Sequence, residues 1–317
     1  MNKLSQQLQS VPRKFADPLV TAKGEERAVV ALTHLSTLWF NTGSLCNITC
    51  VNCYMDSSPT NDDLVYLTLA DVVGYLDEAE TLGIALKEVA FTGGEPLMNR
   101  DLPDMLDAVL GRGLQALVLT NAMKPLHHKK ARLLELKRRY GAALTLRVSL
   151  DHFTQARHEE VRGPGTWAPA LDGLRWLADN GFNIAVAGRT CWGEDETAAR
   201  GGYAALFRAE GIAIDADDHA RMVLFPEMDV GADVPEISVN CWDILGVRPE
   251  SIMCATSRMV VRKKGAADPV VVPCTLLPYD PAFELGADLA GSARAVRLNH
   301  PHCAKFCVLG GASCSPD

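Results

Sequence analysis

The chain has 317 residues, of which 48% are apolar, and carries a formal net charge of −8. A chain of this length and composition buries a sizeable core and forms one large domain or two. The negative balance argues against a nucleic-acid partner, because phosphate binding requires a basic surface. The N-terminus lacks a secretory signal, and no apolar run reaches the ~18 residues that span a bilayer, which predicts a cytoplasmic protein without a membrane partner.

The first 33 residues are polar and interrupted by Pro12, Pro18 and Gly24, and we expect an arm that packs on the main domain. From residue 34 to residue 225, short apolar runs alternate with helical patterns. The predicted strands cover residues 34–41, 87–92, 114–120, 143–150, 182–188 and 221–225. The predicted helices cover residues 68–82, 101–112, 125–140, 166–180 and 198–210. Glycine is favoured just past a helix end, and it stands there at positions 83, 113, 141, 181 and 211.

Strands that alternate with helices indicate βαβ units around a parallel sheet, so residues 34–225 are expected to belong to the α/β class. Six such units are too few for a closed eight-stranded barrel and suit an open or partial one. Parallel α/β folds place their chemistry at the carboxyl ends of the strands. The loops that follow the predicted strands are therefore the expected location of a functional site.

The ten cysteines fall mainly into two groups, three at positions 46–53 and six between positions 241 and 314. A disulfide framework is not expected in a reducing compartment. Two separate groups instead indicate metal ligation at two places in the molecule.

The first group is Cys46, Cys50 and Cys53, in a loop directly after the first predicted strand. Such a loop is able to place three thiolates around one face of a 4Fe–4S cluster. These clusters are normally held by four cysteines, so three would leave one iron open to a ligand that is not protein. Zinc is the first alternative, but it usually takes four protein ligands, and this loop has no fourth cysteine or histidine. A redox CxxC pair is the second, and it would not need Cys46.

This CxxxCxxC spacing, followed by Tyr54, resembles the signature of the radical S-adenosylmethionine (SAM) superfamily. The resemblance implies that the open iron binds the amino and carboxylate groups of SAM. It further implies that an electron from the cluster cleaves SAM to a 5′-deoxyadenosyl radical, which abstracts hydrogen from a substrate. The fold that it implies is a partial (β/α)6 TIM-like barrel, in agreement with the six predicted units. Tyr54 belongs to the implied cofactor site.

A second motif follows the second predicted strand, where Gly93, Gly94, Glu95 and Pro96 stand in sequence. The two glycines allow the backbone to approach a ligand closely. The segment resembles the GGEP motif of the same superfamily, which implies contacts between this backbone and the methionine ammonium of SAM. Alone, such a segment is most simply a turn.

Later strand ends supply weaker candidates. By the same resemblance, Ser149 is a candidate for the SAM ribose. The segment 157–166 resembles the family segment in which an arginine pairs with the SAM carboxylate, and Arg162 is the preferred residue there. A guanidinium suits this role because it forks onto a carboxylate and stays charged. Arg189 is the second choice, and a surface salt bridge is the alternative for both arginines.

The second cysteine group lies in residues 226–317, where a hairpin is predicted at residues 258–262 and 270–272 and a helical segment at residues 281–297. A hairpin flanked by cysteines, then a helix and more cysteines, resembles the SPASM/twitch extensions of radical SAM enzymes. The resemblance implies a small cysteine-rich α+β domain with one auxiliary 4Fe–4S cluster. The preferred ligands are Cys254, Cys274, Cys303 and Cys307, with Cys314 or Cys241 as replacements for one of them. A four-cysteine structural zinc site is the alternative.

An auxiliary cluster suggests how the radical is used, since it is able to accept the electron left on the substrate. The expected function is therefore the oxidation of a small metabolite or a short peptide, with a reductant such as flavodoxin or ferredoxin as partner. The alternatives are a ribosomal-peptide maturase that cross-links or epimerises, and a methyl transferase. A non-catalytic iron–sulfur electron-transfer protein is the alternative from another class, and it would not cleave SAM.

Overall fold

The computed structural model of the chain describes residues 13–227 and 233–311. Its core is an eight-stranded sheet in the order β7-β6-β5-β4-β3-β2-β8-β9, in which only the β8–β9 pair is antiparallel. The strands are β2 (Thr37–Asn41), β3 (Glu88–Thr92), β4 (Gln115–Thr120), β5 (Leu144–Ser149), β6 (Asn183–Thr190), β7 (Met222–Pro226), β8 (Ser257–Val261) and β9 (Val270–Val272). A separate pair joins β1 (Val29–Val30) to β10 (Val296–Arg297).

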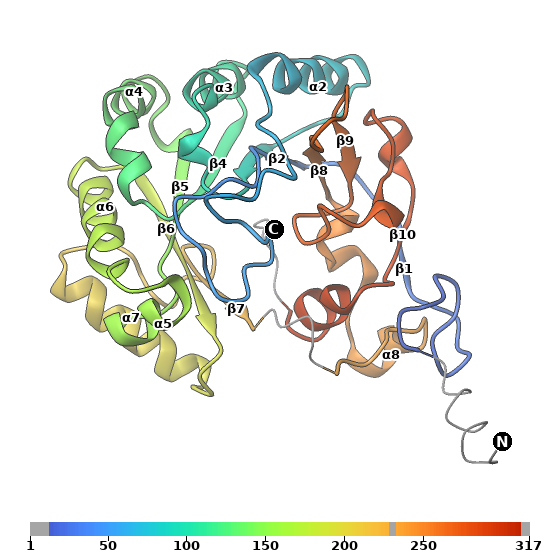
Figure 1. The fold of residues 1–317 in the computed structure, drawn as a ribbon. Helices are drawn as coiled ribbons and strands as arrows, with labels where there is room; N and C mark the ends of the chain where they lie inside the picture. The colour runs from blue at the N-terminus through green and yellow to red at the C-terminus, as the bar shows by residue number, and fades with distance from the viewer. Residues whose placement is uncertain (1–12, 228–232, 312–317) are drawn as a thin grey trace.

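Helices follow most of the strands and form an outer arc around the sheet (Figure 1). They are α2 (Leu69–Thr81), α3 (Leu102–Leu110), α4 (Lys124–Tyr140), α5 (Gln155–Arg162), α6 (Trp167–Asp179), α7 (Glu196–Ala209) and α8 (Cys241–Leu245), with a π-helical turn at Cys303–Val308. None of the helices in the described part of the chain is both long and apolar enough to cross a membrane. The six predicted strands and five predicted helices are confirmed to within three residues at each end.

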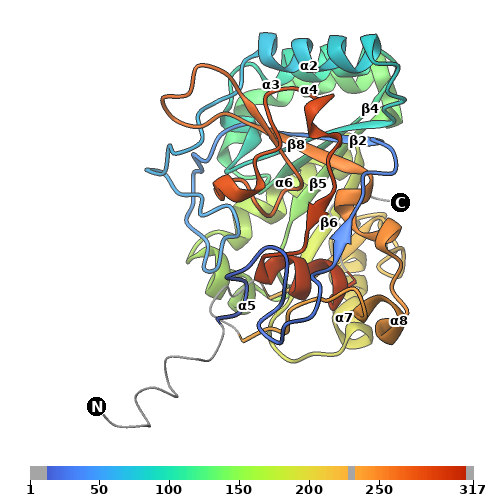
Figure 2. The ribbon, with the colours of Figure 1, turned by 90° about the vertical axis from the view of Figure 1, so that its right-hand side faces the viewer.

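The sheet is buried on both faces, which explains why its strands are nearly continuous apolar runs. Leu38 and Phe40 of β2 face the outer helices and belong to one hydrophobic cluster. Trp39 points the other way, into a second cluster that includes Met259 and Phe306 from the C-terminal region. The C-terminal region thus covers the inner face of the sheet, whereas the helices cover the outer face (Figure 2).

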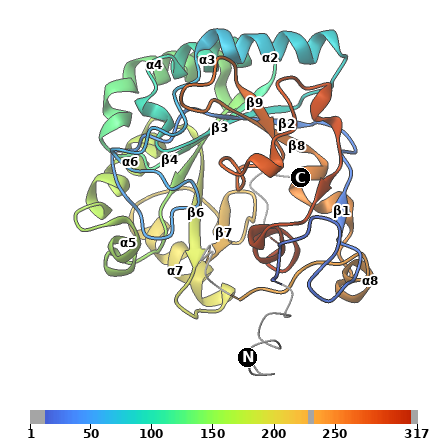
Figure 3. The ribbon, with the colours of Figure 1, turned by 45° about the vertical axis from the view of Figure 1, so that its right-hand side comes forward.

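The predicted hairpin of the C-terminal region is confirmed as β8 and β9. Strand β8 pairs in parallel with β2, with Ser257 opposite Thr37 and Met259 opposite Trp39 (Figure 3). The hairpin therefore extends the same sheet that carries the βαβ units. The predicted domain boundary at residue 226 stays a prediction.

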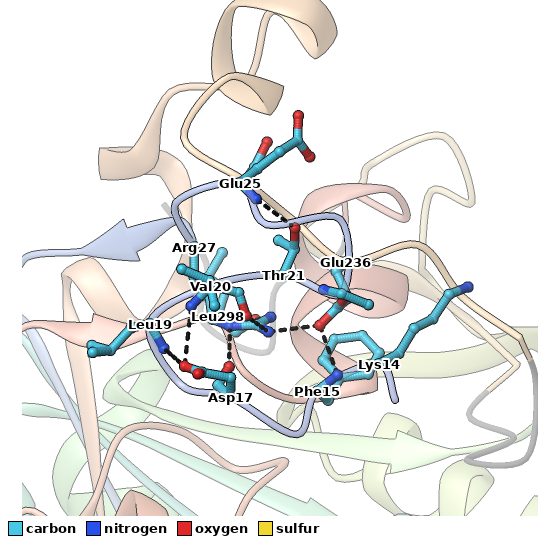
Figure 4. A network of polar contacts seen from close by, with 12 residues as sticks. Lys14, Phe15, Asp17, Leu19, Val20, Thr21, Glu25, Arg27, Glu236 and Leu298 are labelled. Carbon is cyan, nitrogen blue, oxygen red and sulfur yellow. Dashed lines mark hydrogen bonds and ion pairs between the residues drawn. The ribbon is translucent and has the colours of Figure 1, made fainter. Parts of the chain in front are cut away.

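The N-terminal arm makes its main polar contacts with the C-terminal region (Figure 4). Arg27 and Glu236 form an ion pair of 2.6 Å whose side chains are 0% and 5% exposed. The Glu236 carboxylate also accepts hydrogen bonds from the backbone N–H groups of Phe15 and Ala22, both at 2.6 Å. Together with the β1–β10 pair, these contacts fix residues 13–33 against the segment that begins at residue 233.

Two local predictions fail, each for an identifiable reason. The helix expected at residues 281–297 is absent, and the structure has only short turns at Pro281–Phe283 and Gly291–Ala293 before β10. Pro281, Gly286 and Gly291 interrupt this segment, and Gly286 has a φ of 119°, which ends any helical path. Conversely, the sequence does not predict α5, because its eight residues are mostly polar and show no clear apolar stripe.

Candidate functional site

A pocket opens at the carboxyl ends of strands β3 to β7, beside the cysteine loop. It brings together most of the residues that the sequence singles out. The predicted residues that line it are Cys46, Cys50, Cys53, Tyr54, Gly93, Gly94, Ser149, Arg162 and Arg189. Glu95 and Pro96 do not line it. These residues come from five separate segments of the chain, so the pocket is a product of the tertiary fold.

The cysteine loop is anchored by hydrogen bonds along its length. The N–H of Cys46 donates to the Ser58 carbonyl at 3.0 Å, and the N–H of Val51 donates to the Val161 carbonyl of α5 at 2.7 Å. Asn52 has a φ of 50°, a left-handed conformation that asparagine tolerates, and its amide donates to Glu227 Oε1 at 2.6 Å. The loop is thus held from both sides before any cofactor binds.

The thiols of this loop are shielded from water. Burial raises the pKa of Cys46 to about 12 and also raises the pKa of Cys50, an effect that the nearby Arg162 guanidinium opposes at Cys50. Both thiols are therefore protonated at neutral pH in the metal-free chain. Metal binding must displace those protons, since the thiolate is the ligand.

The turn after β3 packs directly on the backbone of the cysteine loop. The N–H of Gly94 donates to the Gly43 carbonyl at 2.8 Å, and the N–H of Glu95 donates to the Leu45 carbonyl at 3.1 Å. A Cβ atom on Gly94 would lie 2.1 Å from the Leu45 carbonyl oxygen, far inside van der Waals contact. Glycine at this position therefore sets the distance between the turn and Cys46.

Gly94→Ala is expected to displace the cysteine loop and to lower the iron content and any SAM cleavage at least tenfold. The clash is with backbone atoms, so it cannot be relieved by a rotamer change, and overpacking of this kind costs about 1–3 kcal/mol or more. Gly74→Ala is the matched control, because Gly74 lies in α2 and a Cβ atom added there would meet nothing within 4 Å. Anaerobic iron analysis of both variants checks the expectation, and equal iron content would contradict it.

Glu95 and Pro96 have a supporting position behind the pocket wall. Glu95 is 1% exposed, and its carboxylate accepts hydrogen bonds from Thr120 Oγ1 at 2.8 Å and from the N–H of Asn121 at 2.7 Å. Burial raises the pKa of this carboxyl, and these hydrogen bonds partly offset the rise. Pro96 begins the short turn that follows. Glu95 thereby ties the turn after β3 to the end of β4.

Asn121 is a pocket residue whose contacts the sequence did not reveal. Its side-chain amide lies 3.8 Å from Cys46 Sγ and donates to Asn47 Oδ1 at 2.9 Å. The available signal was its position directly after a predicted strand. Asn121 therefore orients both Cys46 and the residue that follows it.

Arg162 and Arg189 meet at Asp151, a buried carboxylate just after β5. Arg162 holds it with two hydrogen bonds, Nε to Oδ2 at 2.9 Å and Nη2 to Oδ1 at 3.2 Å, and Arg189 Nε lies 3.7 Å from the same Oδ2. Burial disfavours the Asp151 anion, but the two guanidinium groups outweigh burial and hold its pKa below the usual range. The two cations share one anion and line the pocket with a net positive charge.

His158 of α5 is buried beside this ion cluster, and neither ring nitrogen has a hydrogen-bond partner among the residues that the structure describes. Burial, reinforced by Arg162, lowers its pKa from 6.5 to about 4. The unfolded chain binds a proton at His158 below about pH 6.5, whereas the folded chain does so only below about pH 4. The stability contributed by the neutral ring is therefore complete above pH 6.5 and is lost as the pH falls toward 4.

His158→Phe is expected to flatten the pH dependence of stability by about 2 kcal/mol between about pH 7.5 and about pH 5. The phenyl ring is able to retain the edge-to-face contact with Trp167, whose centroid lies 5.4 Å from the histidine ring. Denaturant unfolding of both proteins across this range measures the difference. Parallel profiles for wild type and variant would contradict the expectation.

A second, apolar cavity lies in the C-terminal region. Four cysteines line it, namely Cys254, Cys274, Cys303 and Cys307. Burial raises the pKa of Cys254 to about 11 and raises that of Cys303 well above its ordinary value. Cys241 lies in α8 and is not part of the lining, while Cys314 lies outside the described residues.

The two cavities are neighbours that share a lining residue. Leu276 lines both of them. The Cys303–Val308 turn presents Cys303 and Cys307 to the second cavity and Phe306 to the first. Phe306 packs against Phe225 at the end of β7, with ring centroids 5.3 Å apart. Leu276 and the Cys303–Val308 turn thus connect the linings of the two cavities.

The donor atoms of the two cavities are thiols, which are the ligands that iron–sulfur clusters take in proteins. Within residues 13–227 and 233–311, no three cysteine, histidine or carboxylate side chains form a group suited to one ion. A cubane cluster uses its thiolates differently, because each binds a separate iron. Three thiols in the first cavity and four in the second match that requirement.

The sequence profile of the Radical SAM superfamily matches residues 40–199. The chain belongs to the radical SAM superfamily. It is accordingly an enzyme, and its family cofactors are a 4Fe–4S cluster and SAM. The matched residues run from β2 into α7 and include the cysteine loop, the turn after β3 and the Asp151 ion cluster.

Several curated proteins resemble this radical SAM enzyme over fewer than half of its residues. The subtilosin biosynthesis protein AlbA of Bacillus subtilis is 29% identical over 143 residues, which are 45% of this chain and 30% of AlbA. The mycofactocin maturase MftC of Mycobacterium ulcerans is 28% identical over 137 residues, 43% of this chain and 35% of MftC. The Fe-coproporphyrin III synthase of Methanosarcina barkeri is 26% identical over 148 residues, 46% of this chain and 35% of the synthase. The chain therefore matches about a third of the length of each.

Solved structures share the fold. SuiB of Streptococcus suis bound to SAM gives a TM-score of 0.58 at 12% identity, covering 80% of this chain and 64% of SuiB. The SAM-bound enzyme anSMEcpe gives a TM-score of 0.56 at 14% identity, covering 80% of this chain and 77% of anSMEcpe. With the six parallel strands β2 to β7 in sequential order, these similarities confirm the predicted partial α/β barrel.

Proposed function

We propose that this radical SAM enzyme oxidises a substrate bound in the first cavity and passes an electron to an auxiliary 4Fe–4S cluster in the second. The single observation that supports this most is that the two cavities are neighbours, since Leu276 lines both. An electron left on the substrate would pass from the first cavity to the adjacent one. Oxidation follows naturally from that arrangement, because the acceptor is part of the same chain.

Cys46, Cys50 and Cys53 would hold the first cluster. When bound, this cluster and SAM supply a 5′-deoxyadenosyl radical that abstracts a hydrogen atom from the substrate. Gly93 and Gly94 line the pocket, and their backbone would contact the methionine end of SAM.

The remaining cofactor candidates lie around the same pocket, at Tyr54, Ser149, Arg162 and Arg189. Arg162 and Arg189 both contact the Asp151 carboxylate, which holds them in place in the lining of the first cavity. They would present a preorganised positive charge to the SAM carboxylate. Glu95 would act indirectly, through the β4 end that it fixes.

Cys254, Cys274, Cys303 and Cys307 would hold the auxiliary cluster, with the apolar lining of that cavity excluding water. Apolar side chains also line the first cavity, including Leu119, Phe225 and Phe306. They would shield a substrate radical from solvent. Arg147 of β5 is buried and lines the same cavity, and it would favour a substrate that carries a negative group.

A peptide is the preferred substrate class. Relatives support it by their names, since AlbA serves bacteriocin biosynthesis, MftC is a maturase, and SuiB has been crystallised with the precursor peptide SuiA. A small metabolite is the second candidate, because the Fe-coproporphyrin III synthase and a GTP 3′,8-cyclase match with similar identity.

Isotope transfer tests the proposal. The anaerobically reconstituted enzyme is incubated with SAM, dithionite and deuterated short peptides, and 5′-deoxyadenosine and the peptides are analysed by mass spectrometry. The proposal predicts deuterium in 5′-deoxyadenosine and a peptide that has lost two hydrogen atoms. A peptide in which one deuterium is replaced by hydrogen at an inverted centre would indicate epimerisation, and an added methyl group would indicate methyl transfer. Either result would contradict oxidation.

A further inference from the structure

Arg258 of β8 is a fully buried guanidinium next to the second cysteine cavity, with 0% exposure. Its donors all go to backbone carbonyls. Nε donates to Ser292 at 2.9 Å, Nη1 to Cys254 at 2.6 Å and to Ser257 at 2.8 Å, and Nη2 to Arg294 at 3.0 Å. The guanidinium thus fixes the backbone of a predicted cluster ligand.

Within the part of the chain that the structure describes, the charge of Arg258 has no carboxylate beside it. Among residues 13–227 and 233–311, no aspartate or glutamate forms an ion pair with it, and the ionisable groups that act on it are Cys254 and Cys274. Arg27 provides the contrast, because it is equally buried but pairs with Glu236 at 2.6 Å (Figure 4). A guanidinium does not escape burial by losing its proton, so Arg258 remains a buried cation.

A buried cation is costly unless an anion lies nearby. Cys254 and Cys274 supply that anion only as thiolates, which is their state when they bind a metal centre. We infer that Arg258 is the counter-charge of the C-terminal 4Fe–4S cluster and raises its reduction potential. The inference rests on the auxiliary cluster of the proposed function.

The direction of the effect follows from charge. A cluster held by four thiolates is negative, and reduction adds one further negative charge. A fixed cation therefore stabilises the reduced state more than the oxidised state, which raises the potential. A higher potential makes the cluster a better acceptor for an electron from the substrate.

Three substitutions separate the charge of Arg258 from its hydrogen bonds. Arg258→Met removes both, Arg258→Gln removes the charge but keeps an amide donor, and Arg258→Lys keeps the charge. Arg200→Met is the matched control, since Arg200 is a buried arginine of α7 whose Nη1 also donates to carbonyls, those of Ala216 and Met222. Each full-length protein is reconstituted anaerobically and titrated potentiometrically with detection by EPR. The signal that SAM perturbs is assigned to the N-terminal cluster.

Arg258→Met and Arg258→Gln are expected to lower the midpoint potential of the C-terminal cluster and to leave the N-terminal midpoint unchanged. Arg258→Lys should stay near the wild type, as should Arg200→Met. Unchanged midpoints in both neutral variants would overturn the inference, and so would an equal shift in Arg258→Lys.

Iron content decides the case in which a variant does not retain the C-terminal cluster. Loss in the neutral variants with retention in Arg258→Lys supports the counter-charge, whereas loss in all three overturns it. A wild-type chain with no C-terminal cluster would overturn the proposed function together with this inference. If the wild-type chain holds both clusters but the neutral Arg258 variants leave the midpoint potential of the C-terminal cluster unchanged, this inference alone would be overturned.

Discussion

Replacing Cys46, Cys50 and Cys53 together with alanine is expected to remove about four irons per chain and to abolish the formation of 5′-deoxyadenosine from SAM. All three thiols line one pocket, and no other cysteine of the described residues lines it. Without them, that pocket retains no thiolate ligand for iron from the described residues. Iron and sulfide analysis and an anaerobic SAM cleavage assay measure the two effects.

Cys191→Ala is the control for this variant, because Cys191 lines neither cavity. It should retain both the iron and the cleavage activity. Retention of either by the triple variant would show that the cluster is held elsewhere.

Replacing Cys254, Cys274, Cys303 and Cys307 with alanine is expected to remove a further set of about four irons and to abolish product formation. Cleavage of SAM should continue, because the first cavity keeps its three thiols. That remaining cleavage also reports that the chain is folded, which matters since three of the four side chains are buried. Full product formation by this variant would contradict the role of the auxiliary cluster.

Metal analysis of the wild type separates this account from a structural zinc site. About eight irons per chain are expected with two clusters, whereas about four irons and one zinc would indicate zinc in the second cavity. Cys241→Ala should not change the iron content, because Cys241 does not line the second cavity. A loss of iron in that variant would restore Cys241 as a ligand.

The sequence predicted the barrel well because the signals for its strands and helices are local in the chain. Apolar runs such as Thr37–Asn41 are strands because both faces of the sheet are covered. Gly83 and Gly181 end their helices with φ values of 66° and 65°, as glycine placement indicated. The helix predicted at residues 281–297 does not form, because proline and glycine interrupt the helical path. Apolar residues of this segment pack into the hydrophobic clusters without a helix.

The sequence predicted many of the residues that line the two cavities, but not the contacts that these residues make. Cysteine spacing identified both groups without any knowledge of the fold. The pairing of Arg162 with Asp151, by contrast, joins residues whose relation depends on how α5 folds back after β5. Phe306 and Leu276 are ordinary core residues in the sequence, and only the tertiary structure puts them between the two cavities.

Superfamily membership also bears on one of the alternative functions that the sequence left open. A non-catalytic iron–sulfur protein that carries electrons is not what the match to residues 40–199 indicates, since this family consists of enzymes. The candidates that remain differ in substrate and in outcome. They all share the same first step, the cleavage of SAM, which we propose takes place in the pocket at Cys46, Cys50 and Cys53.

Reductive cleavage of SAM by the wild-type chain tests that shared step most directly. Reconstituted protein, SAM and dithionite are mixed under anaerobic conditions, and 5′-deoxyadenosine is measured against a sample without reductant. The account predicts reductant-dependent accumulation of 5′-deoxyadenosine together with methionine. Protein that carries its full complement of iron and yet forms no 5′-deoxyadenosine would contradict it.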